Sequence, residues 1–177
     1  LYSFVDNHDV DRIISKIQVK DHIFPIYTLL FTLPGIPSIY YGSEWGIEGR
    51  KEGGNDDPLR PAVEIEEALN KEKDSKIMQH VKWLGNLHKK YTDCLAYGRY
   101  RELLLTNRQY AFARFTQEQG LVVAVNNDEQ EVNISIPVPF ENKMYINLET
   151  EEQLPVEGGR ICLTMKAAGS AFIEIRE

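Results

Sequence analysis

Hydrophobic positions along this chain follow two different patterns, one in each half. In residues 1–97, short apolar runs alternate with longer stretches in which apolar residues recur at helical spacing. From residue 98 onwards, apolar and polar residues alternate with a period of two. The first pattern predicts strands joined by helices, and the second predicts antiparallel strands. We therefore expect an α/β domain over 1–97 and an all-β domain over 98–177.

The first half predicts the order strand, helix, strand, helix. Residues 1–5 (LYSFV) and 36–41 (IPSIYY) are short apolar runs of the kind found in strands buried on both faces. Asp21 can cap the helix that joins them. The second helix is expected to begin near Asp74-Ser75, to present one apolar face and to end around Gly98. Strands joined by helices in this way run parallel, with right-handed crossovers.

Seven short runs in the second half have strand character. They span 100–105, 109–115, 120–126, 131–136, 143–149, 160–165 and 170–176. Turn-forming residues, rich in Asn, Asp, Gly and Pro, separate several of them. This pattern is typical of a small antiparallel sandwich.

Length and charge exclude several classes of protein. With 177 residues, the chain is too short for a complete (β/α)8 barrel, which takes about 250. Its net charge of −7 and the absence of a basic stripe argue against nucleic-acid binding. Proline and glycine interrupt the longest apolar stretch, from Ile23 to Tyr41, so no membrane helix is expected. Cys94 and Cys162 favour two free thiols over a single disulfide, and a metal site is the least favoured reading.

A polar cluster directly follows the first predicted strand. Asp6, Asn7, His8 and Asp9 lie where a parallel strand ends, which is the edge of an α/β sheet where sites are built. An amide, an imidazole and a carboxylate can hydrogen-bond the vicinal hydroxyls of a sugar, and Asp9 can stabilise developing positive charge. The same residue types also suit a loop cluster or a helix cap. A metal site is disfavoured, because one histidine and two carboxylates within four residues do not converge easily.

Two motifs give the chain a specific resemblance. Phe4-Val5-Asp6-Asn7-His8-Asp9, followed by Arg12, resembles the fourth conserved region of the alpha-amylase superfamily, glycoside hydrolase family 13. Residues 33–46 (LPGIPSIYYGSEWG) resemble the eighth barrel strand of that family and its exit. The remainder resembles the last barrel helix and the C-terminal domain. The resemblance implies a partial (β/α)8 TIM barrel of two βα units, followed by an antiparallel Greek-key β-sandwich.

The resemblance implies a retaining mechanism at alpha-glucosidic bonds, through a covalent glycosyl-enzyme. In that family the nucleophilic Asp and the acid/base Glu come from earlier strands, and no strand carrying them is found in these 177 residues. We therefore expect the C-terminal portion of an alpha-amylase-, neopullulanase- or cyclomaltodextrinase-like glycosidase, inactive on its own, whose parent acts on an alpha-glucan oligosaccharide. A carbohydrate-binding module and a non-catalytic amylase-like scaffold are the alternatives.

No cofactor is expected, and calcium is possible only in the full-length parent. The chain begins at Leu1 rather than Met, so we expect either a segment removed upstream or a longer polypeptide. Cytoplasmic and secreted locations both stay open. Two parallel strands by themselves leave two open edges, and open edges pair with other chains. We therefore expect the chain to self-associate through these edges, or its two strands to pack differently.

The resemblance also assigns roles within the polar cluster. Asp9 is similar to the acidic residue that stabilises the transition state by gripping sugar hydroxyls. His8 is similar to a histidine that bonds the same sugar, and Asn7 to a positioning residue. Asp6 is expected to be structural.

Further candidates lie in the long loop over 42–61. Asp56 and Arg60 are similar to an Asp–Arg pair that contacts bound sugars. This loop is shorter than in relatives, so the motif leaves open whether Asp56 or Asp57 is the binding residue, and a solvated charged loop is the alternative. Trp45 can stack on a sugar ring or pack internally. Trp83, on the second helix, is expected in the core.

Overall fold

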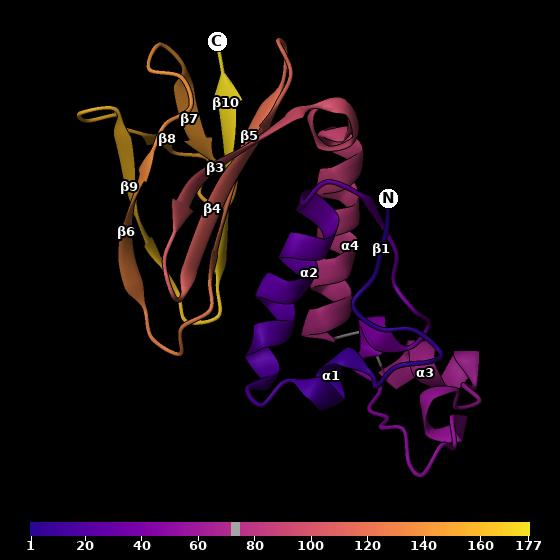
Figure 1. Cartoon of the computed structure of the whole chain (residues 1–177). Helices are drawn as coiled ribbons and strands as arrows, with labels where there is room; N and C mark the ends of the chain where they lie inside the picture. The colour runs from indigo at the N-terminus through magenta and orange to yellow at the C-terminus, as the bar shows by residue number, and fades with distance from the viewer. Residues whose placement is uncertain (72–74) are drawn as a thin grey trace. The chain divides into compact units, whose positions relative to one another are not determined.

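The computed structural model describes residues 1–71 and 75–177 (Figure 1). The chain divides into two compact units: unit 1 comprises Leu1–Phe31 and Gly35–Asn86, and unit 2 comprises Thr32–Pro34 and Leu87–Glu177. This division falls inside the last helix, and the domain boundary expected after residue 97 stays a prediction. Each unit is described separately.

Unit 1 contains short strands, helices and single helical turns. Its elements are β1 (Tyr2–Ser3), α1 (Ile13–Lys16), α2 (Ile23–Thr32), β2 (Ile36–Pro37), α3 (Ile65–Lys71), the first part of α4 (Lys76–Lys90), and 3-10 turns at Lys20–His22, Ser43–Trp45 and Asp57–Leu59. The sequence pattern did not predict α1 and α3, because each is too short to show helical periodicity.

Strands form within the two predicted runs and pair parallel as expected, but each has only two residues, against the predicted 1–5 and 36–41. Tyr2 lies opposite Ile36, and Ser3 lies opposite Pro37. The prediction that these strands are buried on both faces was wrong, because Leu1, Tyr2 and Ile36 are 95%, 66% and 64% exposed. The physical reason is that the pair forms a sheet of only two strands among the described residues, which is too small to be covered on both faces.

The helices of unit 1 pack through α2 and α4. His80 of α4 forms hydrogen bonds with Phe24 O (3.1 Å) and Thr28 Oγ1 (3.3 Å), and its ring packs edge-on against Phe24 at 5.3 Å. Burial lowers the pKa of His80. On α2, fully buried Tyr27 donates from Oη to Ser43 O at 2.9 Å. The His80 bonds join α4 to α2, and the Tyr27 bond holds the segment after β2 against α2.

The apolar face predicted for α4 is confirmed, since Leu84, Leu87 and Tyr91 are buried. The expectation that Trp83 lies in the core was wrong: this residue is 40% exposed. It precedes Leu84 by one position, which turns it about 100° away from the apolar face. At the start of the helix, Met78 N donates to Ser75 Oγ at 3.4 Å. The second candidate cap, Asp74, lies outside the described residues.

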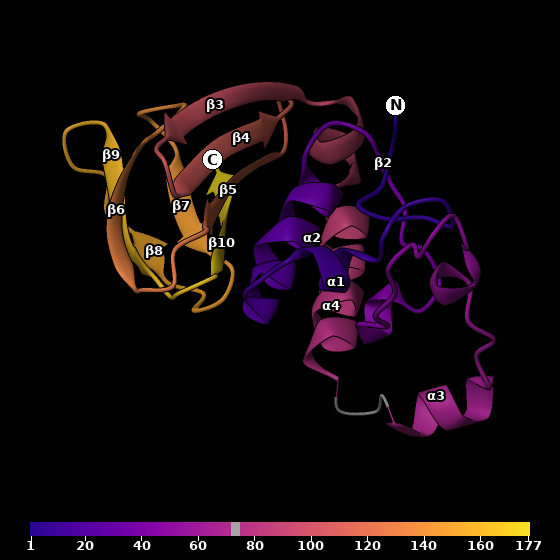
Figure 2. The same ribbon diagram turned by 60° about the horizontal axis from the view of Figure 1, so that its bottom comes forward.

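Unit 2 consists of antiparallel strands and a helical turn, Asp93–Tyr97, that follows α4. Its strands are β3 (Arg99–Leu105), β4 (Gln109–Phe115), β5 (Gly120–Asn126), β6 (Val132–Pro137), β7 (Met144–Asn147), β8 (Gln153–Leu154), β9 (Arg160–Met165) and β10 (Ser170–Arg176). One sheet has the order β3-β4-β5-β10-β7-β8, and the second is β6-β9 (Figure 2). All seven predicted runs become strands. Only β8 was missed, because two residues are too few for an alternating pattern.

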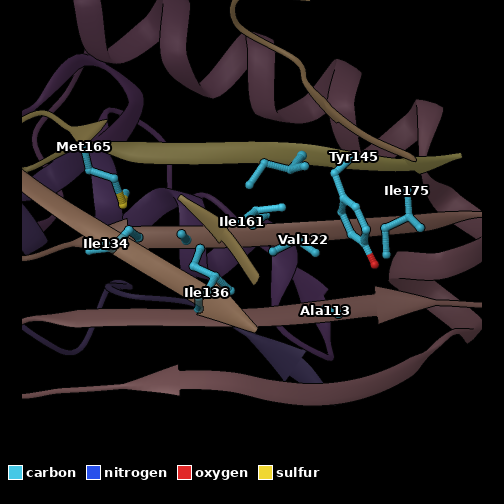
Figure 3. Close-up of a cluster of buried hydrophobic side chains, with 11 residues drawn as sticks. Ala113, Val122, Ile134, Ile136, Tyr145, Ile161, Met165 and Ile175 are labelled. Atoms are coloured by element: carbon cyan, nitrogen blue, oxygen red, sulfur yellow. The ribbon is translucent and has the colours of Figure 1, made fainter. Parts of the chain in front are cut away.

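The core of unit 2 lies between these two sheets (Figure 3). The two-stranded sheet contributes Ile134, Ile136, Ile161 and Met165, and the larger sheet contributes Ala111, Ala113, Val122, Ala124, Tyr145, Ile173 and Ile175. Alternate residues of β6 and β9 enter this core, as the period of two predicted. The Greek-key connection stays a prediction.

Buried Arg114 ties the helical turn to β4 within unit 2. Its Nη1 donates to Thr32 O at 3.1 Å, and its Nη2 donates to Leu95 O at 2.6 Å and to Gly98 O at 3.4 Å. Burial lowers the pKa of Arg114. Three carbonyl oxygens take the place of water at Nη1 and Nη2, whereas Nε is buried without a partner among the described residues.

Nearby Cys94 is buried and Cys162 is exposed, and both are free thiols, as expected. Burial raises the pKa of Cys94 to about 12. No helix within residues 1–71 and 75–177 combines the length and apolar character needed to cross a membrane.

Candidate functional site

The candidate site is built around Arg12, which is fully buried in unit 1. Its Nη1 donates to Tyr41 O and to Ser43 Oγ (3.3 Å), and its Nη2 donates to Leu59 O at 2.8 Å. The guanidinium also lies 4.2 Å from the ring centroid of Tyr40. One side chain therefore links the segment after β1, the exit of β2 and the long loop.

Asp6 completes this buried framework. Its Oδ2 accepts hydrogen bonds from Ile13 N (2.8 Å) and from Ser43 Oγ (2.7 Å), and the residue is 2% exposed. A carboxylate that accepts the first amide of α1 fixes the start of that helix. Gly42 allows the approach of Ser43, because its φ of +84° is a conformation that favours glycine. The structural role expected for Asp6 fits this geometry.

Above this framework lie the exposed residues of the polar cluster. Asn7 Oδ1 accepts a hydrogen bond from Asp9 N at 2.8 Å, which closes the tight turn of the cluster. Asp9 presents both carboxylate oxygens to nitrogen atoms: Oδ2 lies 3.2 Å from His8 Nε2, and Oδ1 lies 3.3 Å from Arg60 Nη2. Arg60 Nε also donates to His8 O at 3.1 Å. The turn and the distant arginine together fix the direction of the Asp9 carboxylate.

Asp56 extends the cluster on the other side of Arg60. Its Oδ2 lies 3.1 Å from Arg60 Nη2, and its Oδ1 lies 2.8 Å from Lys51 Nζ. The hydrogen bond to Lys51, followed by the other nearby cations, lowers the pKa of the Asp56 carboxyl. Asp57 instead begins a 3-10 turn, with its backbone amide donating to Asn55 Oδ1 at 2.9 Å. The structure therefore pairs Arg60 with Asp56 rather than with Asp57.

Trp45 is the one expected site residue that the structure does not join to this cluster. It lies half-buried at the end of the 3-10 turn Ser43–Trp45. Its indole Nε1 is buried without a hydrogen-bond partner among the described residues. The ring that does lie beside the cluster is Tyr40, whose centroid is 6.4 Å from that of His8. Over residues 1–71 and 75–177, no three His, Cys, Asp or Glu side chains are grouped as a metal site would require.

Two family models match this chain. The model "Alpha amylase, catalytic domain" matches residues 1–135, and the model "Maltogenic Amylase, C-terminal domain" matches residues 100–171. The first match alone covers well over half of the 177 residues. The chain belongs to the alpha-amylase family. The resemblance seen in the two sequence motifs is thereby confirmed.

Curated members of the alpha-amylase family resemble the chain along nearly all of its length. A cyclomaltodextrinase of Geobacillus thermopakistaniensis is 26% identical over 174 residues, which is 95% of this chain and 28% of the relative. Neopullulanase 2 of Thermoactinomyces vulgaris is 27% identical over 170 residues, 94% of this chain and 28% of the relative. The chain thus spans a little over a quarter of the length of these curated relatives.

Solved structures of alpha-amylase family members share the fold. A cyclomaltodextrin glucanotransferase named CldA superposes with a TM-score of 0.81 at 24% identity, covering 100% of this chain and 37% of its own. An alpha-amylase of Geobacillus thermoleovorans, solved with acarbose, gives a TM-score of 0.78 at 24% identity, covering 100% and 39%. At such identities the likeness concerns the fold alone.

Sequence reasoning missed Lys51 and Tyr40 as neighbours of the alpha-amylase-like cluster. Tyr40 lies inside the motif at 33–46, so the motif itself could have indicated it. Lys51 gave no such indication, because a lysine in a loop rich in charge is ordinarily solvated. Its position becomes meaningful only once the fold brings it to Asp56.

Replacing Arg12 by lysine tests the buried framework. A single ammonium cannot reproduce the planar fork, so at least one of the carbonyls of Tyr41 and Leu59 is left without its donor. We expect Arg12→Lys to lower the free energy of unfolding by about 1 to 3 kcal/mol, measured by urea denaturation. The matched Arg108→Lys, at an exposed turn, should change it by less than about 0.5 kcal/mol. Equal effects of the two substitutions would contradict the framework role.

The pairing of Lys51 with Asp56 predicts a pH dependence. A carboxyl whose pKa is lowered on folding stabilises the folded state above the pKa of the unfolded chain, and this stabilisation is lost as pH falls through the folded pKa. We expect Lys51→Met to raise the pKa of Asp56 toward its ordinary value, as followed by NMR of the carboxyl carbon. Lys82→Met, on the exposed side of α4, is the control. An unchanged Asp56 titration in Lys51→Met would refute the assignment.

Proposed function

We propose that this chain is the C-terminal portion of a retaining alpha-glucan glycoside hydrolase of the amylase, neopullulanase or cyclomaltodextrinase type. In this proposal, β1 and β2 are neighbouring strands of a (β/α)8 barrel, and residues 98–177 form a Greek-key sandwich. The parallel pairing of β1 with β2 supports the first part. The two antiparallel sheets around one core support the second.

A single observation carries the function: Asp9 lies in the turn that follows β1, oriented by His8 and Arg60. Each carboxylate oxygen has one nitrogen partner and retains a lone pair for a sugar hydroxyl. The Asp9 side chain is 59% exposed. Its negative charge would face the positive charge that develops on the sugar ring as the glycosidic bond breaks. We assign transition-state stabilisation to Asp9.

The surrounding residues would bind the same sugar. His8 and Arg60 can donate to ring hydroxyls while they hold Asp9, and Asp56 can accept from a neighbouring hydroxyl. Asn7 would position the turn, and its amide nitrogen can donate. The proposal keeps Trp45 as a stacking residue at the rim. No cofactor is proposed for the reaction, and calcium stays a possibility for the full-length parent.

The chain alone is proposed to be inactive. Retaining hydrolysis needs a nucleophilic carboxylate and a second carboxyl that is protonated when it acts as acid. Asp56 does not suit the acid role, because its lowered pKa keeps it ionised at neutral pH. Asp9 lies against Arg60 and is already assigned to transition-state stabilisation. The nucleophile and the acid would come from other strands of the parent.

The proposed sugar site and the proposed inactivity are tested by separate measurements, one of sugar binding and one of hydrolysis. We expect maltotriose to shift the amide resonances of residues 7–9 in NMR titrations, and Arg60→Ala to abolish these shifts by releasing Asp9 and Asp56. Arg108→Ala removes an exposed arginine of unit 2 and should leave them intact. In parallel, the chain should release no nitrophenol from nitrophenyl maltoside. Maltotriose shifts that survive in Arg60→Ala would refute the site, and turnover matching a full-length relative would refute the predicted inactivity.

Self-association through β1 and β2 is part of the same proposal. Their exposed apolar residues include Tyr2 and Ile36, at 66% and 64% exposed, and each strand has one unpaired edge among the described residues. Light scattering should therefore show oligomers. Ile36→Lys places a charge on the edge and should give a monomer. Leu69→Lys, at a helix position that is 58% exposed, should not. A wild-type chain that is monomeric would refute this proposal.

A further inference from the structure

Two consecutive tyrosines at the exit of β2 lie against the buried cation of unit 1. The guanidinium carbon of Arg12 is 4.2 Å from the ring centroid of Tyr40 and 5.1 Å from that of Tyr41. The two rings meet edge-on, with their centroids 4.7 Å apart. A guanidinium within about 6 Å of an aromatic face is attracted to it. Because Arg12 is fully buried and permanently charged, it restrains both rings.

A tight turn brings the two rings together. Consecutive side chains of an extended strand point to opposite faces, so neighbouring tyrosines would normally separate. Here Ser43 N donates to Tyr40 O at 3.0 Å, which closes a turn. At its centre Tyr41 is followed by Gly42, whose φ of +84° and ψ of −17° are those of the third residue of a type II turn. The chain therefore turns at the point where both tyrosines can pack on Arg12.

Tyr40 connects Arg12 to the imidazole of the polar cluster. The ring centroids of Tyr40 and His8 are 6.4 Å apart, and the ring planes are inclined by 53°. This distance lies within the range over which aromatic rings pack favourably. His8 in turn places its Nε2 3.2 Å from Asp9 Oδ2. Although the His8 side chain is 58% exposed, the Tyr40 ring limits the directions open to it.

Tyr41 acts on the other neighbour of the carboxylate. Its hydroxyl donates to Pro61 O at 3.0 Å, and Pro61 directly follows Arg60. On the preceding side, Leu59 O accepts from Arg12 Nη2 at 2.8 Å. The backbone is thus held on both sides of the arginine that pairs with the carboxylate of the polar cluster. A fixed backbone leaves this long side chain fewer ways to turn away from its partner.

We propose that Tyr40 and Tyr41 are positioning residues that orient Asp9 for its assigned role. Tyr40 does so by restraining His8, and Tyr41 does so by restraining Arg60. The chemical consequence rests on the proposed function, whereas the two restraints rest on the contacts alone. The buried framework thereby reaches the exposed carboxylate by two separate routes, one through an aromatic ring and one through a hydroxyl.

Substitutions at Tyr40 test the role of the ring. In Tyr40→Leu, the ring protons of His8 lose the ring current of the tyrosine, so their NMR resonances should move toward those of an unstructured histidine. Maltotriose binding, followed by the amide resonances of residues 7–9, should weaken by about 2- to 12-fold, the range for one aromatic pair. Tyr40→Phe keeps the ring and should restore both readouts. The ring resonances of His80, which packs against Phe24, should stay in place and show that the fold is intact.

Tyr41→Phe tests the role of the hydroxyl. It removes the bond to Pro61 O, so the side-chain Nε–H resonance of Arg60, which donates to the backbone of the polar cluster at 3.1 Å, should shift or broaden. Maltotriose binding should weaken by about 2- to 12-fold, the range for one hydrogen bond. Tyr2→Phe is the matched control, because it removes a hydroxyl that bonds Ser38 Oγ at 2.6 Å, outside the polar cluster. This control should change neither readout.

Measurements without and with sugar separate this inference from the proposed function. Unchanged His8 ring resonances in Tyr40→Leu and an unchanged Arg60 resonance in Tyr41→Phe would overturn the positioning role, as would wild-type maltotriose affinity in both variants. A change in only one variant would overturn the role of the other tyrosine. If the wild-type resonances of residues 7–9 never move with maltotriose, the proposed function fails, and the sugar-free resonances still decide whether the tyrosines hold His8 and Arg60.

Discussion

The burial of the Arg12 guanidinium is the constraint on which the candidate site depends. Arginine stays charged at all accessible pH values, and burying its donors is costly unless they meet acceptors; here Nη1 and Nη2 do so, while Nε has no partner among the described residues. Those acceptors are Tyr41 O, Ser43 Oγ and Leu59 O, which come from two separate stretches of irregular chain. Satisfying one side chain therefore fixes the conformation of a loop that has few regular elements of its own. Arg60 follows Leu59 directly, so the same constraint places it.

Outside this buried framework, charges of alternating sign follow one another from Lys51 through Asp56 and Arg60 to Asp9. Exposed ion pairs of this kind contribute little to the free energy of unfolding. What they determine is the orientation of the carboxylates, because each carboxylate oxygen faces one nitrogen. Stability and orientation thus come from different residues, the first from Arg12 and Asp6, the second from the exposed series.

Sequence reasoning succeeded where a repeating environment imposes a period. Each strand of unit 2 has one face toward the core, so its apolar residues recur at every second position. This alternation revealed every strand except β8, which has only two residues. It failed where burial depends on neighbours distant in sequence: Leu1, Tyr2 and Phe4 are exposed, and Trp83 lies beside an apolar face without joining it. The motif resemblance gave Asp9 and Arg60 separate sugar-binding roles, and only the structure showed that these residues, 51 positions apart, are in contact. No local pattern encodes such a contact, and Lys51 was missed for the same reason.

Helix α4 belongs to both units, and this has a consequence for dissecting the protein genetically. A truncation beginning at residue 98 would look natural from the change in sequence pattern. It would remove Leu87, Tyr91 and Leu95, which are buried, and it would remove the Thr32 and Leu95 carbonyls that accept from Arg114. The excised sheets would then carry an interior cation stripped of two acceptors. An autonomously folding version of unit 2 has to include the helical turns before Gly98.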